Sequence, residues 1–108
     1  MEFKTTIIDD YSIVALSGEI DLYCSADARR EILDQLTKNK SVLVDLSDVS
    51  YIDSSAVASL VEGYQMAAKN NLKFGLVSVS NEAMQVLKLA RLDKIFSIHD
   101  SIELAIKG

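Results

Sequence analysis

The chain has 108 residues, 49% of them hydrophobic, and its 16 Asp and Glu outnumber its 11 Lys and Arg, which gives a formal net charge of −5. This balance argues against nucleic acid or an anionic membrane as a partner, because both require a basic face that releases counterions. No apolar run approaches the ~18 residues that span a bilayer, and the first residues do not resemble a signal peptide. We therefore expect one domain over residues 1–108, a cytoplasmic location without membrane insertion, and a protein partner.

An antiparallel hairpin is predicted at the start of the chain. Two apolar, β-branched runs at about 2–8 and 12–17 flank the turn residues Asp9 and Asp10. Gly18 is expected to end the second strand.

The first helix is predicted to follow a short extended piece at residues 19–22. It should begin at Ser25 or Asp27 and end near Lys38. Its apolar positions recur at helical spacing and are Ala28, Ile32, Leu33 and Leu36.

A junction between a strand and a helix is the most informative part of the sequence. Residues 41–46 contain the run Val42-Leu43-Val44, which is typical of a strand covered on both faces. A helix is predicted over 55–70, capped by Asp53 or Ser54. Its apolar stripe holds Val57, Leu60, Val61, Tyr64, Ala67 and Ala68, and its polar face holds Ser55, Ser59, Glu62, Gln65 and Lys69.

A serine at this junction is a natural acceptor for phosphate. The first N–H groups of a helix lack intrahelical partners, and the helix dipole places positive charge at the same end. Ser54 and Ser55 both lie there, and Ser55 is predicted to begin the solvent face. The plainest alternative is that the two serines only cap the helix, since serine is among the commonest caps.

Two further pairs of strand and helix complete the chain. The strands are predicted at about 73–79 and 95–98, and the last helix begins at Asp100 or Ser101. The helix between them is expected to be capped by Asn81 and to bury Ala83, Val86, Leu87 and Ala90. Alternating strands and helices form right-handed parallel crossovers. We therefore predict an α/β fold with a mixed, mostly parallel sheet of four to five strands and about four helices.

Catalytic and metal sites are not indicated. Cys24 and His99 are the only residues of their types, so the sequence offers neither a disulfide nor a set of metal ligands. Gly-rich phosphate loops and the nucleophile elbow of hydrolases are missing from the sequence. We predict no metal, no cofactor and no enzymatic activity.

A phosphoacceptor receiver domain is a weaker alternative. Asp9, Asp10 and Asp45 match its early acid pair and its central aspartate. In a receiver, however, a helix follows the acid pair directly, whereas residues 11–16 have the pattern of a strand.

Three segments resemble the signatures of the STAS domain family. They are residues 18–21, 44–55 and 89–96, which occur in order and span most of the chain. Proteins of this length in the family resemble bacterial anti-sigma factor antagonists. The resemblance implies a partner that is both a serine kinase and an anti-sigma factor, and a phosphatase that reverses the modification.

The resemblance also implies the site. Ser55 is the implied phosphate acceptor, with Ser54 as the alternative. The implied partner-binding residues are Asp21, Asp53, Ser54, Ser55, Ala56, Ser59 and Glu62. Two positions depart from the family pattern, because Ala56 and Arg91 stand where glycine is usual. Ala56 supports a second interpretation, a constitutive STAS subunit that contacts the ATPase of a lipid transporter or a signalling complex without being phosphorylated.

Phosphate on Ser55 would add about −1.5 to −2 charges. The helix N-terminus favours this charge by about 0.3–1 kcal/mol, while Asp53 and Asp21 oppose it by a comparable amount. Because these terms nearly cancel inside the domain, we expect the phosphate to act at the docking surface, by like-charge repulsion, without a large conformational change.

Overall fold

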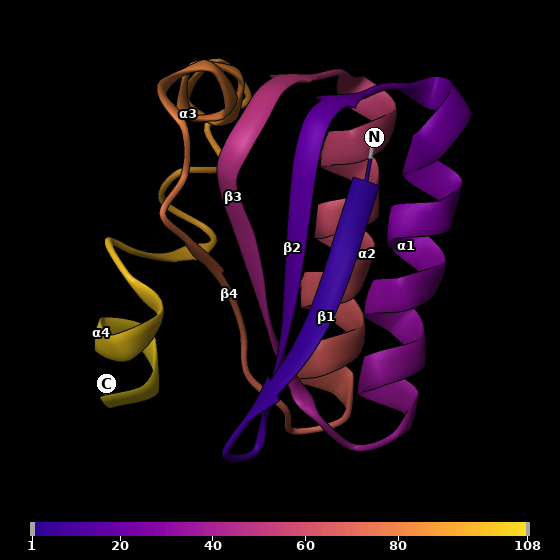
Figure 1. Ribbon diagram of the computed structural model, residues 1–108, viewed down its shortest axis with the longest axis vertical. Coiled ribbons are helices and arrows are strands. Elements are labelled where there is room, and N and C mark those ends of the chain that lie inside the picture. The colour runs from indigo at the N-terminus through magenta and orange to yellow at the C-terminus, as the bar shows by residue number, and fades with distance from the viewer. Residues whose placement is uncertain (1, 108) are drawn as a thin grey trace.

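A computed structural model of the chain describes residues 2–107, which form five strands and four helices. In chain order these are β1 (Glu2–Ile8), β2 (Tyr11–Ile20), α1 (Leu22–Thr37), β3 (Ser41–Ile52), α2 (Ser54–Lys69), β4 (Phe74–Val77), α3 (Asn81–Leu89), β5 (Ser97–His99) and α4 (Ile102–Lys107). The strands lie in one sheet in the order β1-β2-β3-β4-β5 (Figure 1). β1 is antiparallel to β2 and every other neighbouring pair is parallel, so the predicted mixed α/β sheet is confirmed.

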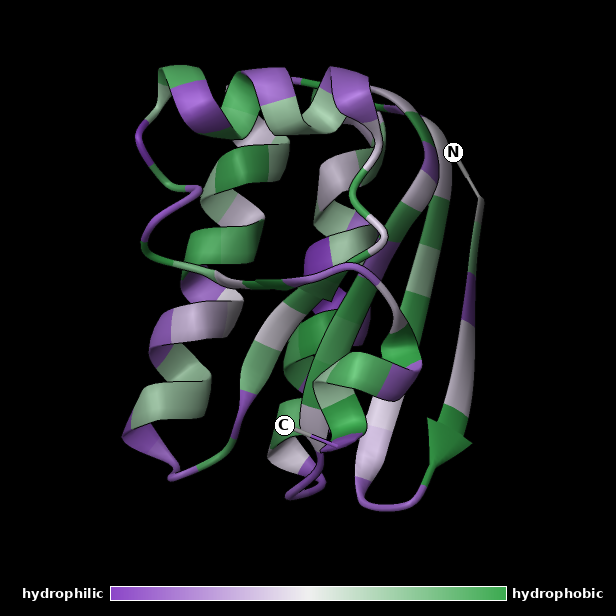
Figure 2. Ribbon diagram, turned by 90° about the vertical axis from the view of Figure 1, so that its left-hand side faces the viewer, coloured by the Kyte–Doolittle hydropathy of each residue, from purple (hydrophilic) through white to green (hydrophobic). Residues whose placement is uncertain are grey.

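The helices cover the sheet unequally. α1 and α2 lie side by side along one face, and the main core between them and the sheet includes Val14, Val44, Ile32 and Leu60 (Figure 1). The other face is covered in part by α4, whose Ala105 packs against apolar residues of β2, β3 and β4 (Figure 2). Most of the buried apolar residues therefore lie on the side of the sheet that α1 and α2 cover.

The end of β2 differs from the prediction. Gly18 does not end the strand, because it adopts a positive φ of 80° beside a shift in the β2–β3 register, and pairing continues to Ile20. Glycine adopts this conformation without strain, so the strand passes through a bulge instead of stopping. As a result Asp21, and not Ser25 or Asp27, is the residue from which α1 starts.

Other predicted boundaries also shift. β3 continues to Ile52, beyond the predicted end at 46, because it keeps pairing with β2 past the register shifts. Ser80 caps α3 in place of Asn81, since its hydroxyl oxygen accepts the N–H of Ala83 at 3.2 Å. The predicted burial of Ala68 and Ala90 is wrong, because both lie on the solvent side of their helices.

Gly63 allows α2 to lie close to the sheet. A Cβ atom at this position would lie 2.8 Å from the ring of Phe74 and 2.9 Å from Cγ2 of Ile32. Real Cβ atoms do not approach so closely, so any other residue here would force these two side chains or α2 to shift.

Candidate functional site

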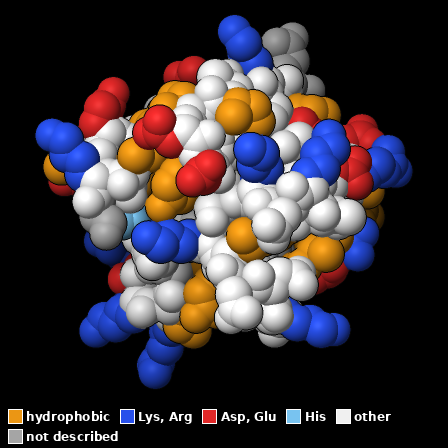
Figure 3. Space-filling view, turned by 90° about the horizontal axis from the view of Figure 1, so that it is seen from below, with side chains coloured by type: hydrophobic (Ala, Val, Ile, Leu, Met, Phe, Trp, Pro, Cys, Tyr) orange, Lys and Arg blue, Asp and Glu red, His pale blue; other side chains and the backbone are white. Residues whose placement is uncertain are grey.

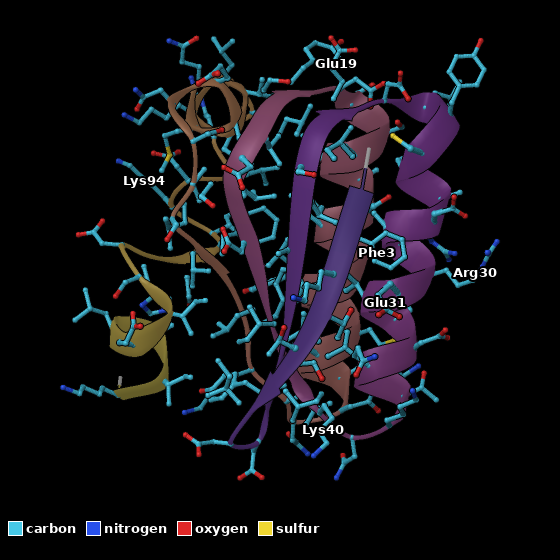
Figure 4. All side chains as sticks on the ribbon, in the orientation of Figure 1. Phe3, Glu19, Arg30, Glu31, Lys40 and Lys94 are labelled. Carbon is cyan, nitrogen blue, oxygen red and sulfur yellow. The ribbon has the colours of Figure 1, made fainter. Side chains whose placement is uncertain are left out.

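The starts of α1 and α2 lie next to each other at one end of the sheet. β2 and β3 are parallel neighbours, and Ile20 pairs with Ile52 where both strands end. The N–H of Asp53 donates to the carbonyl of Ile20 at 3.2 Å, which ties the two strand ends together. Glu19 marks this end of the molecule, and Lys40 marks the opposite end (Figure 4). Residues that are far apart in sequence therefore form one surface.

Asp53 organises the junction. It caps α2, and its Oδ1 accepts the Ser55 hydroxyl at 2.5 Å and the Ala56 N–H at 3.0 Å. The Ser55 hydroxyl lowers the pKa of Asp53 most, desolvation opposes this, and the N–H groups of Ala56, Ser55 and Leu22 lower it further. The carboxylate thus stays ionised and holds the first turn of α2. Of the two predicted caps, Asp53 is confirmed.

The two serines differ in exposure. Ser54 is exposed, whereas Ser55 is half-buried and its hydroxyl hydrogen points to Asp53. The expectation that Ser55 opens the solvent face is therefore only partly correct. Both serines lie in the first turn of α2, where backbone N–H groups and the helix dipole favour an anion.

The other predicted contact residues separate into buried and exposed groups. The predicted exposure of Ser59 is wrong, because it is only 6% exposed, lies against α1, and donates to the carbonyl of Ser55 at 3.1 Å. Ala56 is also buried. Glu62 is exposed but accepts from Nε of Arg29 at 2.7 Å. The burial of Ser59 weighs against a direct partner contact there.

Asp21 is a helix cap like Asp53. Its carboxylate accepts the N–H of Tyr23 at 3.0 Å, and its own N–H lies 3.3 Å from Sγ of Cys24, which completes a capping box. The capping box starts α1 at Leu22, and the side chains of Leu22 and Tyr23 in the first turn of α1 are exposed to solvent.

The sequence prediction missed the exposed apolar residues near the start of α1 and the end of β3. Leu22 is 69% exposed, Tyr23 92% and Tyr51 49%. Leu22 and Tyr23 are the first two residues of α1, and Tyr51 lies two residues before Asp53, opposite Glu19 in the β2–β3 register. In sequence these residues looked like parts of extended segments; the signal that could have found them is Asp21 as a cap followed by apolar residues.

The two segments that hold the ends of β2 and β3 and the starts of α1 and α2 are acidic. Segments 17–27 and 46–58 contain Glu19, Asp21, Asp27, Asp48 and Asp53 but no Lys, Arg or His. The opposite end, where α1 and α2 finish, carries Lys38, Lys40, Lys69 and Lys73 beside Asp9 and Asp10 of the β1–β2 turn. Figure 3 shows that end, with Lys and Arg side chains both near its centre and around its border, and with carboxylates among them.

Within residues 2–107, no group of three or more His, Cys, Asp or Glu side chains is placed to hold a metal ion. Among the helices of that range, none is long and apolar enough to cross a membrane.

Comparison with known proteins identifies the fold and the signatures. The family model described as the STAS domain matches residues 2–105. The chain belongs to the STAS domain family. The STAS resemblance of the three sequence segments is thereby confirmed.

Curated STAS relatives are named as regulators. A putative anti-sigma factor antagonist of Thermotoga maritima is 31% identical over 108 residues, which cover 97% of this chain and 95% of the relative. The anti-sigma-B factor antagonist of Bacillus subtilis is 28% identical and is covered over 82% of its length, against 88% of this chain. These relatives are regulatory proteins by name, and their names point to protein partners.

Solved structures agree with this STAS fold. The crystal structure of a putative anti-sigma factor antagonist from Thermotoga maritima has a TM-score of 0.89 at 30% identity and covers 97% of this chain and 92% of its own. The Bacillus cell fate determinant SpoIIAA in its phosphorylated form has a TM-score of 0.78 at 17% identity, with 98% and 97% covered. At this lower identity the likeness shows the fold alone.

Proposed function

We propose that this STAS protein is an anti-sigma factor antagonist that binds its partner through the start of α2 and is switched by reversible phosphorylation of Ser55. The partner is a serine kinase that is itself the anti-sigma factor, and a phosphatase restores the unmodified form. The protein acts in the cytoplasm as a binding protein, with no metal or cofactor.

One observation carries the proposal. The Ser55 hydroxyl lies in the first turn of α2, at the positive end of the helix dipole, and is held by Asp53 at 2.5 Å. A phosphate there gains the helix N-terminus as a partner but loses the Asp53 hydrogen bond and lies close to that carboxylate. These opposing terms are similar in size, so the fold itself should change little.

Phosphorylation of Ser55 is expected to change the affinity for the partner and not the fold. Ser55 lies within the surface formed by the starts of α1 and α2. A phosphate dianion in a contact surface either keeps its hydrating water, which holds the partner away, or loses that water at a high cost in free energy. The unmodified protein should therefore bind the kinase tightly and the phosphorylated protein weakly.

The test uses the protein in its own cell. The tagged wild-type chain is purified, bound proteins are identified, and the peptide that contains Ser54 and Ser55 is analysed by mass spectrometry. We expect a serine kinase among the bound proteins and a single phosphate, lost in Ser55→Ala and retained in Ser54→Ala. Phosphate that persists in Ser55→Ala and disappears in Ser54→Ala would move the acceptor to Ser54.

A second function is favoured by one residue. Ala56, which stands where the family usually has glycine, belongs to the first turn of α2 and is buried. If the backbone of that turn is not approached by a kinase, the chain is a constitutive subunit beside an ATPase of a lipid transporter or within a signalling complex. A stable ATPase partner together with an unmodified serine peptide under all growth conditions would select this function.

A further inference from the structure

A hollow lies at the opposite end of the strands from Ser55 and is not used by the proposed function. Tyr11 and Phe74, which begin β2 and β4, both line it, whereas Ser55 follows the end of β3. The volume of the hollow is about 370 Å³. This volume falls within the range of about 300–1,000 Å³ that is typical of small-molecule sites.

Gly75 leaves space in the floor of the hollow. Leu43, Gly75 and Ser97 are register partners in the neighbouring strands β3, β4 and β5, and all three line the hollow. A Cβ atom at Gly75 would lie 3.2 Å from Cδ2 of Leu43 and 3.5 Å from Cδ2 of His99, so it would project among the lining side chains. From α4 only the small side chain of Ala105 reaches this place, so the space stays open.

Most of the lining is apolar or aromatic. Tyr11, Tyr64 and Phe74 contribute rings to it. Tyr64 and Phe74 also pack in the core on the α2 side, and β5 pairs with β4 only from Gly75 onward. The hollow therefore extends around the edge of β4 at Phe74. Aromatic rings favour another ring in an edge-to-face or offset-stacked position, so the lining suits an aromatic ligand.

Lys73 and His99 supply the polar groups that could orient such a ligand. Both line the hollow, and none of its lining residues is an Asp or Glu. Within residues 2–107, the Lys73 ammonium and the His99 imidazole form neither an ion pair nor a hydrogen bond. The histidine, pale blue in Figure 3, lies next to a Lys or Arg side chain at this end of the molecule. Two unpaired N–H donors are thus available to a carboxylate.

The carboxylates nearest in the fold do not line the hollow. Asp45 is on the same face of the sheet as Leu43, one register row further along β3, and accepts the N–H of Ser47 at 2.9 Å. Asp9 and Asp10 are exposed in the β1–β2 turn and lie outside the lining. The charge within the hollow itself therefore favours an anion.

We propose that this hollow binds a small aromatic carboxylate. The ring of the ligand packs against Tyr11 and Phe74 over the space left by Gly75, and its carboxylate accepts hydrogen bonds from Lys73 and His99. This site is separate from the start of α2, so the proposal stands or falls independently of the proposed function.

The test titrates isotope-labelled protein with benzoate and with 3-phenylpropionate, and follows the backbone amides by NMR. We expect saturable shifts at Leu43, Gly75 and His99, with a dissociation constant of about 1 mM or tighter for at least one of the two probes. Benzamide keeps the ring but lacks the charge, and acetate keeps the charge but lacks the ring. Each should bind at least about fivefold more weakly than benzoate or 3-phenylpropionate, because each loses one of the two kinds of contact.

Two lysine variants separate the hollow from general charge. Lys73→Gln removes the ammonium and should weaken binding of the aromatic carboxylates at least about fivefold. Lys69→Gln is the matched control, because Lys69 is exposed at the same end of the molecule, in the last turn of α2, and does not line the hollow. The control should bind like wild type. Both variants should melt close to wild type, since both side chains are exposed.

Several results would overturn the proposal. Neither aromatic carboxylate may give saturable shifts, or the shifts may fall on residues outside the hollow. Equal affinities of Lys73→Gln and Lys69→Gln would show that the ammonium in the hollow does not bind the carboxylate. Binding of acetate as tight as that of the aromatic carboxylates would show that the rings contribute nothing, and equally tight binding of benzamide would remove the role of charge.

Discussion

Asp53 can be tested with two substitutions that remove different parts of its role. Asp53→Ala removes the oxygen that accepts the Ala56 N–H and the Ser55 hydroxyl, so the first turn of α2 loses its cap. Loss of an N-cap side chain costs about 1 kcal/mol, with a range of about 0.5–2 kcal/mol. For a domain of roughly this size, each kcal/mol lowers the melting temperature by about 4–8 °C.

Asp53→Asn keeps an oxygen in the capping position and removes only the charge. Asparagine caps helices as well as aspartate does, so the remaining loss is the favourable interaction of the charge with the helix dipole, about 0.3–1 kcal/mol. We therefore expect the order of stability to be wild type, then Asp53→Asn, then Asp53→Ala, in thermal or urea unfolding at neutral pH.

The pH dependence provides an internal check. The pKa of Asp53 is lowered from its ordinary value of 3.8, first by the Ser55 hydroxyl, so its ionised form stabilises the folded state. That stabilisation is complete above pH 3.8 and is lost as the pH falls through the lower pKa of the folded state. The advantage of wild type over Asp53→Asn should therefore shrink in acid, while other carboxylates cancel in the comparison. An unchanged advantage down to pH 2, or equal losses for the Asn and Ala variants, would refute this account of the junction.

Three further predictions concern the same helix. Ser55→Asp should weaken kinase binding in titration calorimetry with little change in melting temperature; unfolding or unchanged affinity would contradict the docking mechanism. Ala56→Gly should cost up to about 1 kcal/mol of stability and raise the phosphorylation rate if docking limits it, whereas an unchanged rate favours the constitutive subunit. Gly63→Ala should destabilise by about 1–3 kcal/mol in urea unfolding, because its Cβ would overlap Phe74 and Ile32, and a neutral effect would mean that α2 shifts freely.

Periodicity was sufficient to predict the sheet and the order of the helices. Residues 42–44 form a continuous apolar run and α2 has a clear stripe, so the start of β3 and both ends of α2 were predicted within one residue, whereas the continuation of β3 from 46 to Ile52 was not. The start of α1 was missed because Asp21 caps a helix whose first residues, Leu22 and Tyr23, are apolar and yet exposed. Local pattern assigns apolar residues to the interior, and only the tertiary arrangement places these two on the surface.

The candidate site was predicted only in part, for a similar reason. Ser54, Ser55 and Asp53 follow one another, so their shared position could be read from the chain. The polar side chain of Ser59 suggested a solvent face, but α1 packs over it, and its hydroxyl is satisfied by backbone carbonyls of Ser55 and Ser25. Contacts between α1 and α2 depend on the packing of two segments that are distant in sequence, and a single helical pattern does not reveal them.

The separation of charge between the two ends of the sheet has a kinetic consequence. Segments 17–27 and 46–58 contain carboxylates and no cation, and lysines lie near the ends of α1 and α2, so the layer formed by these two helices carries an electric dipole along the strands. Such a dipole turns an approaching molecule during diffusion, so a cationic partner meets the Ser55 end first and associates faster at low ionic strength. Phosphorylation would enlarge this dipole, so encounters with the partner would become more frequent even as each docked complex becomes shorter-lived.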